Sequence, residues 1–159
     1  MILAEAHPSP AKLWLAATPP HGDNEPDDEA QGPDMAQQSL RVLIVEDEFF
    51  ISLHTKDLLH ALGHTVVAIA VSADEAVSIA EQEGADVVLM DIRLVGARDG
   101  IDAAEEIYRR FGISSVFVTA NTDVQTRRRA ASVQPLGFLE KPLTEERLKT
   151  GLSGIVPKL

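Results

Sequence analysis

The residues of this chain that could do chemistry are a few polar side chains, each placed just after or at the end of a short apolar segment. They comprise an acidic pair, a lone aspartate, a threonine and a lysine, namely Glu46 and Asp47, Asp91, Thr119, and Lys141. If the apolar segments are parallel strands, their carboxyl ends lie along one edge of a sheet and bring these side chains together. Three carboxylates, a hydroxyl and an ammonium in one pocket suit a divalent cation and a phosphoryl group.

Asp91 is the candidate nucleophile, because a carboxylate can accept a phosphoryl group and form an acyl phosphate. The neighbouring Glu46 and Asp47 would repel it, and such repulsion raises carboxyl pKa values. Mg²⁺ would offset this repulsion, since it prefers oxygen ligands and draws charge from a transferring phosphoryl group. Lys141 offers a compact positive charge to one phosphate oxygen, and the Thr119 hydroxyl offers a hydrogen bond to another.

Taken one at a time, these residues have simpler interpretations. An acidic residue after a strand, such as Asp47, is usually a turn former or a helix N-cap. Thr119 alone is most often a strand residue with a satisfied hydroxyl, and Lys141 followed by Pro142 is a common loop dipeptide. All of them together, each with a strand-like segment before it, favour the shared pocket.

Strand-like and helix-like segments alternate from residue 40 onward. The expected strands are 41–45, 65–70, 86–90, 115–119 and 137–140. The first and fourth expected helices cover 48–62 and 123–132. The second begins at a capping box over 72–75 and ends at Gly84, the third has its apolar face over 101–111, and the fifth is capped by Thr144. Short apolar strands between helices indicate βαβ units, a parallel sheet and a doubly wound three-layer α/β fold.

Composition limits the classes of protein that the chain can belong to. A length of 159 residues with 45% hydrophobic and 25% charged residues is typical of one soluble globular domain. The absence of cysteine excludes disulfides and thiolate metal sites and favours a cytoplasmic location. No apolar run approaches the roughly 18 residues that a membrane span needs. The net charge of −11 argues against general binding to nucleic acid or anionic membranes.

The first 39 residues differ from the rest. They are rich in proline and hold seven acidic residues against one lysine. Such a segment has too little apolar content to form a core, so we expect a disordered tail over 1–39 and a folded domain over 40–159.

These residues and their strand positions resemble the receiver domains of two-component response regulators, over about residues 40–156. The resemblance implies a five-stranded flavodoxin-like sheet of strand order 2-1-3-4-5. It also implies that Glu46 and Asp47 bind Mg²⁺ and that a histidine kinase or phosphotransfer protein phosphorylates Asp91. Thr119 and Lys141 complete the site in this family.

The resemblance assigns further roles. The backbone carbonyl of Arg93 would be a metal ligand, the Lys141–Pro142 bond would be cis, and Arg93 and Asn121 would modulate the phosphoryl lifetime. Thr119 and Phe138 would form the switch. Output would pass through the face built by the fourth helix, the fifth strand and the fifth helix. The chain departs from the common pattern in its Glu-Asp acidic pair, in a loop after Asp91 without the usual proline, and in Phe138 where tyrosine is frequent.

The leading hypothesis is therefore a stand-alone receiver, a Mg²⁺-dependent phosphoacceptor without turnover of an independent substrate, which acts through protein contacts or as a phosphate sink that drains a shared kinase. One alternative is a phosphorylation-independent adaptor of the same fold. Another is a haloacid-dehalogenase-type phosphohydrolase, which is disfavoured because those enzymes carry a second Asp where this chain has Arg93. Arg127–Arg129 is a solvated face or a partner site. His60 and His64 are both expected at exposed or edge positions.

Overall fold

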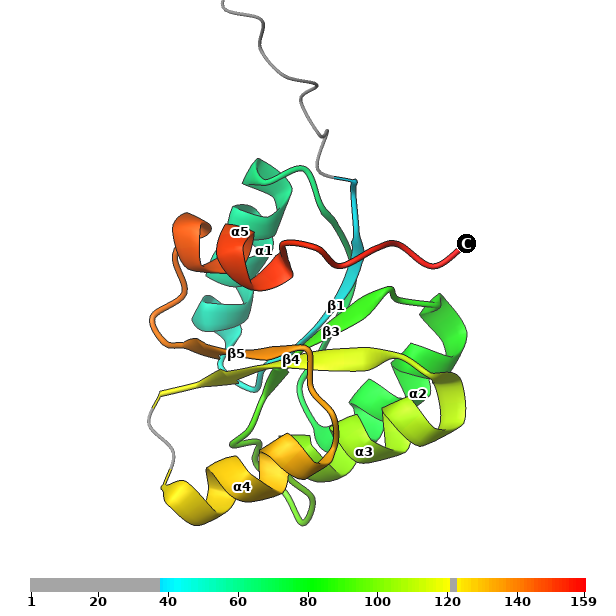
Figure 1. The fold of residues 1–159 in the computed structure, drawn as a ribbon, viewed down its shortest axis with the longest axis vertical. Helices are drawn as coiled ribbons and strands as arrows, with labels where there is room; N and C mark the ends of the chain where they lie inside the picture. The colour runs from blue at the N-terminus through cyan, green and yellow to red at the C-terminus, as the bar shows by residue number, and fades with distance from the viewer. Residues whose placement is uncertain (1–37, 121–122) are drawn as a thin grey trace, which may run out of the picture. The chain divides into compact units, whose positions relative to one another are not determined.

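The computed structural model describes residues 38–120 and 123–159, and within them the chain forms a doubly wound α/β fold (Figure 1). Five parallel strands run in the order β2-β1-β3-β4-β5, which confirms the expected architecture and strand order. The strands are β1 (Arg41–Val45), β2 (Thr65–Ala70), β3 (Val87–Asp91), β4 (Ser114–Thr119) and β5 (Gly137–Glu140). The helices are α1 (Phe49–Ala61), α2 (Ala73–Glu83), α3 (Gly100–Phe111), α4 (Val124–Ser132) and α5 (Glu145–Leu152).

Helices cover both faces of the sheet. Figure 1 shows α1 and α5 on one side of it and α2, α3 and α4 on the other. Side chains alternate between the two faces along each strand, so every central strand contributes side chains to two hydrophobic cores. One core packs strand residues such as Phe117 against Ile101 and Ile107 of α3, and the other packs Leu89 and its neighbours against Leu148 of α5.

The strand β3 begins at Val87, one residue later than expected, and the preceding Asp86 binds two backbone amides through its side chain. Its carboxylate accepts the backbone N–H of Arg41 (2.7 Å) and that of Lys158 (2.7 Å). Lys158 Nζ also donates to the carbonyl of Gly112 (2.7 Å), just past the end of α3. These contacts hold the C-terminal segment at the amino ends of the strands, and the predicted site lies at the opposite, carboxyl ends.

Polar side chains fix where several helices begin. The hydroxyl of Ser72 accepts the N–H of Glu75 (3.2 Å) as the sequence predicts, but Glu75 accepts the N–H of Val71 (2.8 Å) rather than that of Ser72. A complete capping box opens α3, where Asp99 caps the helix and Asp102 accepts the Asp99 N–H. The first turn of α3 is therefore fixed by its own side chains.

The expectation for His64 is wrong, although His60 is exposed as expected. His64 is 4% exposed, and its Nδ1 accepts the backbone N–H of Leu40 (3.2 Å). Nε2 finds no hydrogen-bond partner among the described residues. Burial lowers the pKa of His64 below its ordinary value, since a charged ring would lose its contact with water.

This buried imidazole predicts that acidification destabilises the fold. The unfolded chain takes up the His64 proton at higher pH than the folded chain, so this contribution to stability is complete above about pH 6.5 and declines as the pH falls below it. Urea denaturation of the wild type at pH 8 and pH 5.5 measures the loss. We expect a smaller loss in His64→Gln, whereas the exposed control His60→Gln should lose as much as the wild type. Equal losses in all three proteins would contradict the prediction.

Residues 1–37 of the expected disordered tail over 1–39 lie outside the described residues, so the disorder of this segment stays a prediction. The same holds for the modulating role of Asn121, because residues 121–122 are not described. None of the described helices has the length and apolar character to cross a bilayer.

Candidate phosphoacceptor site

Strand register brings the predicted site residues to one edge of the sheet. Val45 of β1 pairs with Met90 of β3, so Glu46 and Asp91 come next to each other at the ends of their strands. Asp91 is level with Val118 of β4, and Thr119 follows it. Residues separated by up to 95 positions in the sequence thus gather at the carboxyl ends of four parallel strands, as the sequence predicts.

Lys141 joins two of the three carboxylates. Its Nζ donates to Glu46 Oε2 (2.7 Å) and to Asp91 Oδ2 (2.8 Å). The side chains are 16% exposed for Lys141, 5% for Glu46 and 8% for Asp91, so both ion pairs are largely removed from water. A buried carboxylate without such a partner is costly. Lys141 therefore makes the close approach of Glu46 and Asp91 compatible with the folded state.

Burial and hydrogen bonding shift the pKa values of this group in defined directions. Burial raises the pKa of Glu46 above its ordinary value, and the hydrogen bond from Lys141 only partly offsets the effect. For Lys141, burial lowers the pKa, but the hydrogen bonds to Asp91 and Glu46 outweigh burial and raise it. The ammonium of Lys141 stays charged at neutral pH.

The carboxylates have the composition of a hard-cation site. One oxygen from each of Glu46, Asp47 and Asp91 lies within 4.8 Å of the other two. Asp47 is half-buried, and among the described residues Lys141 donates only to the other two acids. Oxygen ligands that open toward solvent fit Mg²⁺, which keeps several of its waters. The donor set therefore fits the predicted cation.

Arg93, in the segment after β3, contacts Asp91 through its backbone. Its N–H donates to Asp91 Oδ1 (2.9 Å), and its side chain is exposed. The two Asp91 oxygens therefore have different partners, the Arg93 amide on one and the Lys141 ammonium on the other. The role of the Arg93 carbonyl as a metal ligand stays a prediction.

The two predicted switch residues lie on β4 and β5. Thr119 is 4% exposed at the end of β4, and its carbonyl accepts the N–H of Lys141 (2.8 Å). Phe138 is half-buried and stacks on Phe117, with 5.7 Å between ring centroids and 29° between ring planes. The Lys141–Pro142 bond is cis, as the resemblance implies.

Several contacts of the site were not foreseen from the sequence. The N–H of Glu48 donates to Glu46 Oε1 (3.1 Å), so both oxygens of Glu46 are held. Arg129 of α4 forms ion pairs with Asp99 (2.5 Å) and Asp102 (2.6 Å), the capping box of α3. The Asp-x-x-Asp spacing signals the cap but not its partner 30 positions away. Arg127 and Arg128, the rest of the basic cluster, are exposed.

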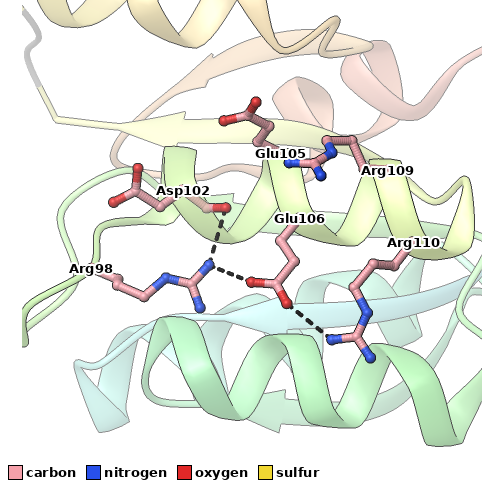
Figure 2. A pocket seen from close by; sticks show the side chains of 6 residues that line it. All are labelled: Arg98, Asp102, Glu105, Glu106, Arg109 and Arg110. Carbon is pink, nitrogen blue, oxygen red and sulfur yellow. Dashed lines mark hydrogen bonds and ion pairs between the residues drawn. The ribbon is translucent and has the colours of Figure 1, made fainter.

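A separate hollow of about 360 Å³ beside α3 contains none of the predicted site residues (Figure 2). Arg98 donates to Glu106 (2.6 Å), which in turn accepts from Arg110 (2.9 Å). Arg98 also pairs with Asp74 of α2 (2.9 Å). Arg98, which precedes α3, thus links Asp74 of α2 to Glu106 of α3, while the pair of Glu106 and Arg110 lies within α3, so these lining charges are already paired.

Comparisons with known proteins identify the family. A model described as the response regulator receiver domain matches residues 42–153. The phyllosphere-induced regulator PhyR of Methylorubrum extorquens is 35% identical over 94 residues, covering 58% of this chain and 35% of PhyR. The transcriptional regulatory protein PdtaR of Mycobacterium tuberculosis is 36% identical over 104 residues, covering 65% of this chain and 50% of PdtaR.

A solved structure agrees with this match. The signal receiver domain of a modulated diguanylate cyclase from Desulfovibrio desulfuricans has a TM-score of 0.70 at 32% identity, covering 74% of this chain and 94% of that one. The chain spans only about a third to a half of the length of the two curated relatives. From the matched family model and the strand order, the chain belongs to the response regulator receiver domains of two-component systems.

Proposed function

We propose that this receiver domain accepts a phosphoryl group on Asp91 in a Mg²⁺-dependent reaction and signals through protein contacts. The observation that carries the proposal is the juxtaposition of three carboxylates with one largely buried lysine at the carboxyl edge of the sheet. The donor would be a phosphohistidine on a kinase or a phosphotransfer protein. The role is stoichiometric, because the acceptor is the protein itself.

Each side chain has a part in this reaction. An Asp91 oxygen forms a bond to phosphorus while the bond between phosphorus and the donor breaks, and the donor leaves with the electron pair. Lys141 already lies 2.8 Å from Asp91 and is placed to pair with the added phosphate charge. Asp47, Glu46 and Asp91 would hold Mg²⁺, which when bound draws negative charge from the transferring group. The Thr119 hydroxyl and the Arg93 carbonyl are the remaining proposed contacts.

The experiment is incubation of the protein with acetyl phosphate and MgCl₂, followed by intact mass measurement. We expect the mass to increase by one phosphoryl group in the wild type and in Asp57→Asn, a matched control on the exposed part of α1. Asp91→Asn should gain none, and excess EDTA should prevent the gain in the wild type. Phosphorylation of Asp91→Asn at the wild-type rate would contradict the proposal.

Other outcomes identify the alternative functions. A wild type that gains no phosphoryl group from acetyl phosphate or from a phosphorylated histidine kinase would be the phosphorylation-independent adaptor. Sustained release of inorganic phosphate from a phosphoester over many turnovers would indicate the phosphohydrolase. Either outcome overturns phosphoacceptance as the main function.

The proposed output surface is the face formed by α4, β5 and α5. Val124 on α4 is 68% exposed, and Leu136 just before β5 is 50% exposed. The structure describes all of α4 (Val124–Ser132), and Ala130 is the only buried residue of this helix. A helix with so little apolar burial can shift at small cost when its surroundings change. This supports α4 as part of the surface that reports on Asp91 to a protein partner.

A further inference from the structure

We propose that Gly100 is a positioning residue for the phosphoacceptor, because it lets the first turn of α3 close directly onto the backbone of Asp91. This inference rests on the function proposed above and adds a residue to it. Gly100 is buried and is the first residue of α3. It is separated from Asp91 by the eight-residue segment 92–99, which contains the predicted metal ligand Arg93.

Gly100 has no room for a side chain. A Cβ atom built on it would lie 1.9 Å from the carbonyl oxygen of Asp91 and 2.9 Å from the carbonyl carbon. The side chain of Met90 would be 3.0 Å away. The first two atoms belong to the backbone of a central strand, so no side-chain rotation can relieve the contact. Any other residue would force the end of β3 and the start of α3 apart by about 1 Å.

This close approach shapes the segment after Asp91. The N–H of Gly100 donates to the carbonyl of Ile92 (3.0 Å) and so joins the two ends of the segment. Within the closed segment, the N–H of Arg93 donates to Asp91 Oδ1 (2.9 Å). Separation of Gly100 from Asp91 would therefore move the amide that orients the Asp91 carboxylate, together with the Arg93 carbonyl proposed to bind Mg²⁺.

The capping box holds α3 in this position from the other side. Asp99 Oδ1 accepts the N–H groups of Ile101 (3.0 Å) and Asp102 (3.0 Å). The helix start is thus fixed by its cap, and the glycine allows the fixed helix to contact the strand. Neither Gly100 nor Asp99 reaches the reacting atoms, so both act through the placement of Asp91 and Arg93.

The test compares Gly100→Ala with Gly137→Ala, a matched control in β5 where an added Cβ meets nothing within 4 Å. The measurements are the rate of phosphorylation by acetyl phosphate with Mg²⁺, the Mg²⁺ affinity followed by amide chemical shifts, and the Arg93 amide resonance. For Gly100→Ala we expect a rate reduced roughly 100-fold, because a misplacement of about 1 Å has a cost of that order. We also expect weaker Mg²⁺ binding and an Arg93 amide shifted toward its non-hydrogen-bonded position.

A wild-type rate with an unchanged Arg93 resonance in a folded Gly100→Ala variant would overturn the inference. If Gly100→Ala does not fold, Asp99→Ala decides, because it releases the start of α3 without adding an atom beside Asp91. Its rate is compared with that of Arg129→Ala, which removes the ion pairs to Asp99 and Asp102 but keeps the cap. A rate lower than that of Arg129→Ala supports the inference, and an equal rate overturns it.

The same experiment separates this inference from the function on which it rests. A wild type that gains no phosphoryl group refutes phosphoacceptance itself. A wild type and a Gly100→Ala variant that are phosphorylated equally fast refute only the role of Gly100.

Discussion

Replacement of Lys141 by methionine is expected to lower the free energy of unfolding by about 3–5 kcal/mol, the cost of removing one partner from a buried ion pair. Glu46 and Asp91 would remain buried beside each other without the ammonium that now lies 2.7 Å and 2.8 Å from them. Methionine keeps most of the side-chain length, so lost packing contributes little. Urea denaturation at pH 7 in EDTA measures the change.

The control for this variant is Lys149→Met on α5, where the lysine is exposed. That change should alter the free energy of unfolding by no more than about 0.5 kcal/mol. Addition of MgCl₂ should recover part of the stability lost in Lys141→Met, because a cation that binds the folded carboxylates stabilises the folded state. Equal unfolding free energies for the two variants would show that the lysine does not stabilise the cluster.

The second large effect is expected from Phe117→Ala, which should destabilise the fold by about 3–5 kcal/mol. Phe117 is completely buried in the middle of β4, and its removal leaves a cavity under α3. It also removes the ring on which Phe138 stacks. Denaturation should be compared with Phe50→Ala, which makes the same change at a side chain that is 83% exposed and should cost about 0.5 kcal/mol or less.

The two outcomes of this comparison have different meanings. A large loss for Phe117→Ala alone places the ring in the core that supports Phe138. Losses within 1 kcal/mol of each other would mean that β4 tolerates a cavity of this size, contrary to what the complete burial of Phe117 leads us to expect. Aromatic proton resonances of Phe138 should also change in Phe117→Ala, since the stacked ring is gone.

Elements set by short local patterns could be predicted from the sequence. Thr144 caps α5 by accepting the N–H of Arg147, and Gly84 ends α2 with a left-handed φ of 60°. Each of these features depends on a few neighbouring residues, so a single sequence contains the information. The strand order could be predicted because the resemblance to a known family gave it.

Features that depend on distant partners could not be predicted. The buried His64 accepts a backbone N–H from 24 positions away, and Arg129 pairs with acids 27 and 30 positions away. The site shows the same division. Residue types at strand ends predicted the cluster, but they did not predict which carboxylates Lys141 contacts, namely Glu46 and Asp91. Nor did they predict that the backbone N–H of Arg93 donates to Asp91. The tight contact of Gly100 also requires coordinates, because sequence gives no distance to the strand end.

The position of β2 at one margin of the sheet has a consequence for how the protein should be handled. Its sequence Thr65–Ala70 contains neither charge nor proline, and its outer hydrogen-bonding groups face no further strand of the described sheet. Margins of this kind invite pairing between molecules and aggregation. The irregular register opposite Val42 and Leu43 interrupts a regular template at that point. Val66 to Ala70 belong to or pack against the two cores, so the exposed Thr65 is the position of β2 where a charged residue should block such pairing without disturbing the fold.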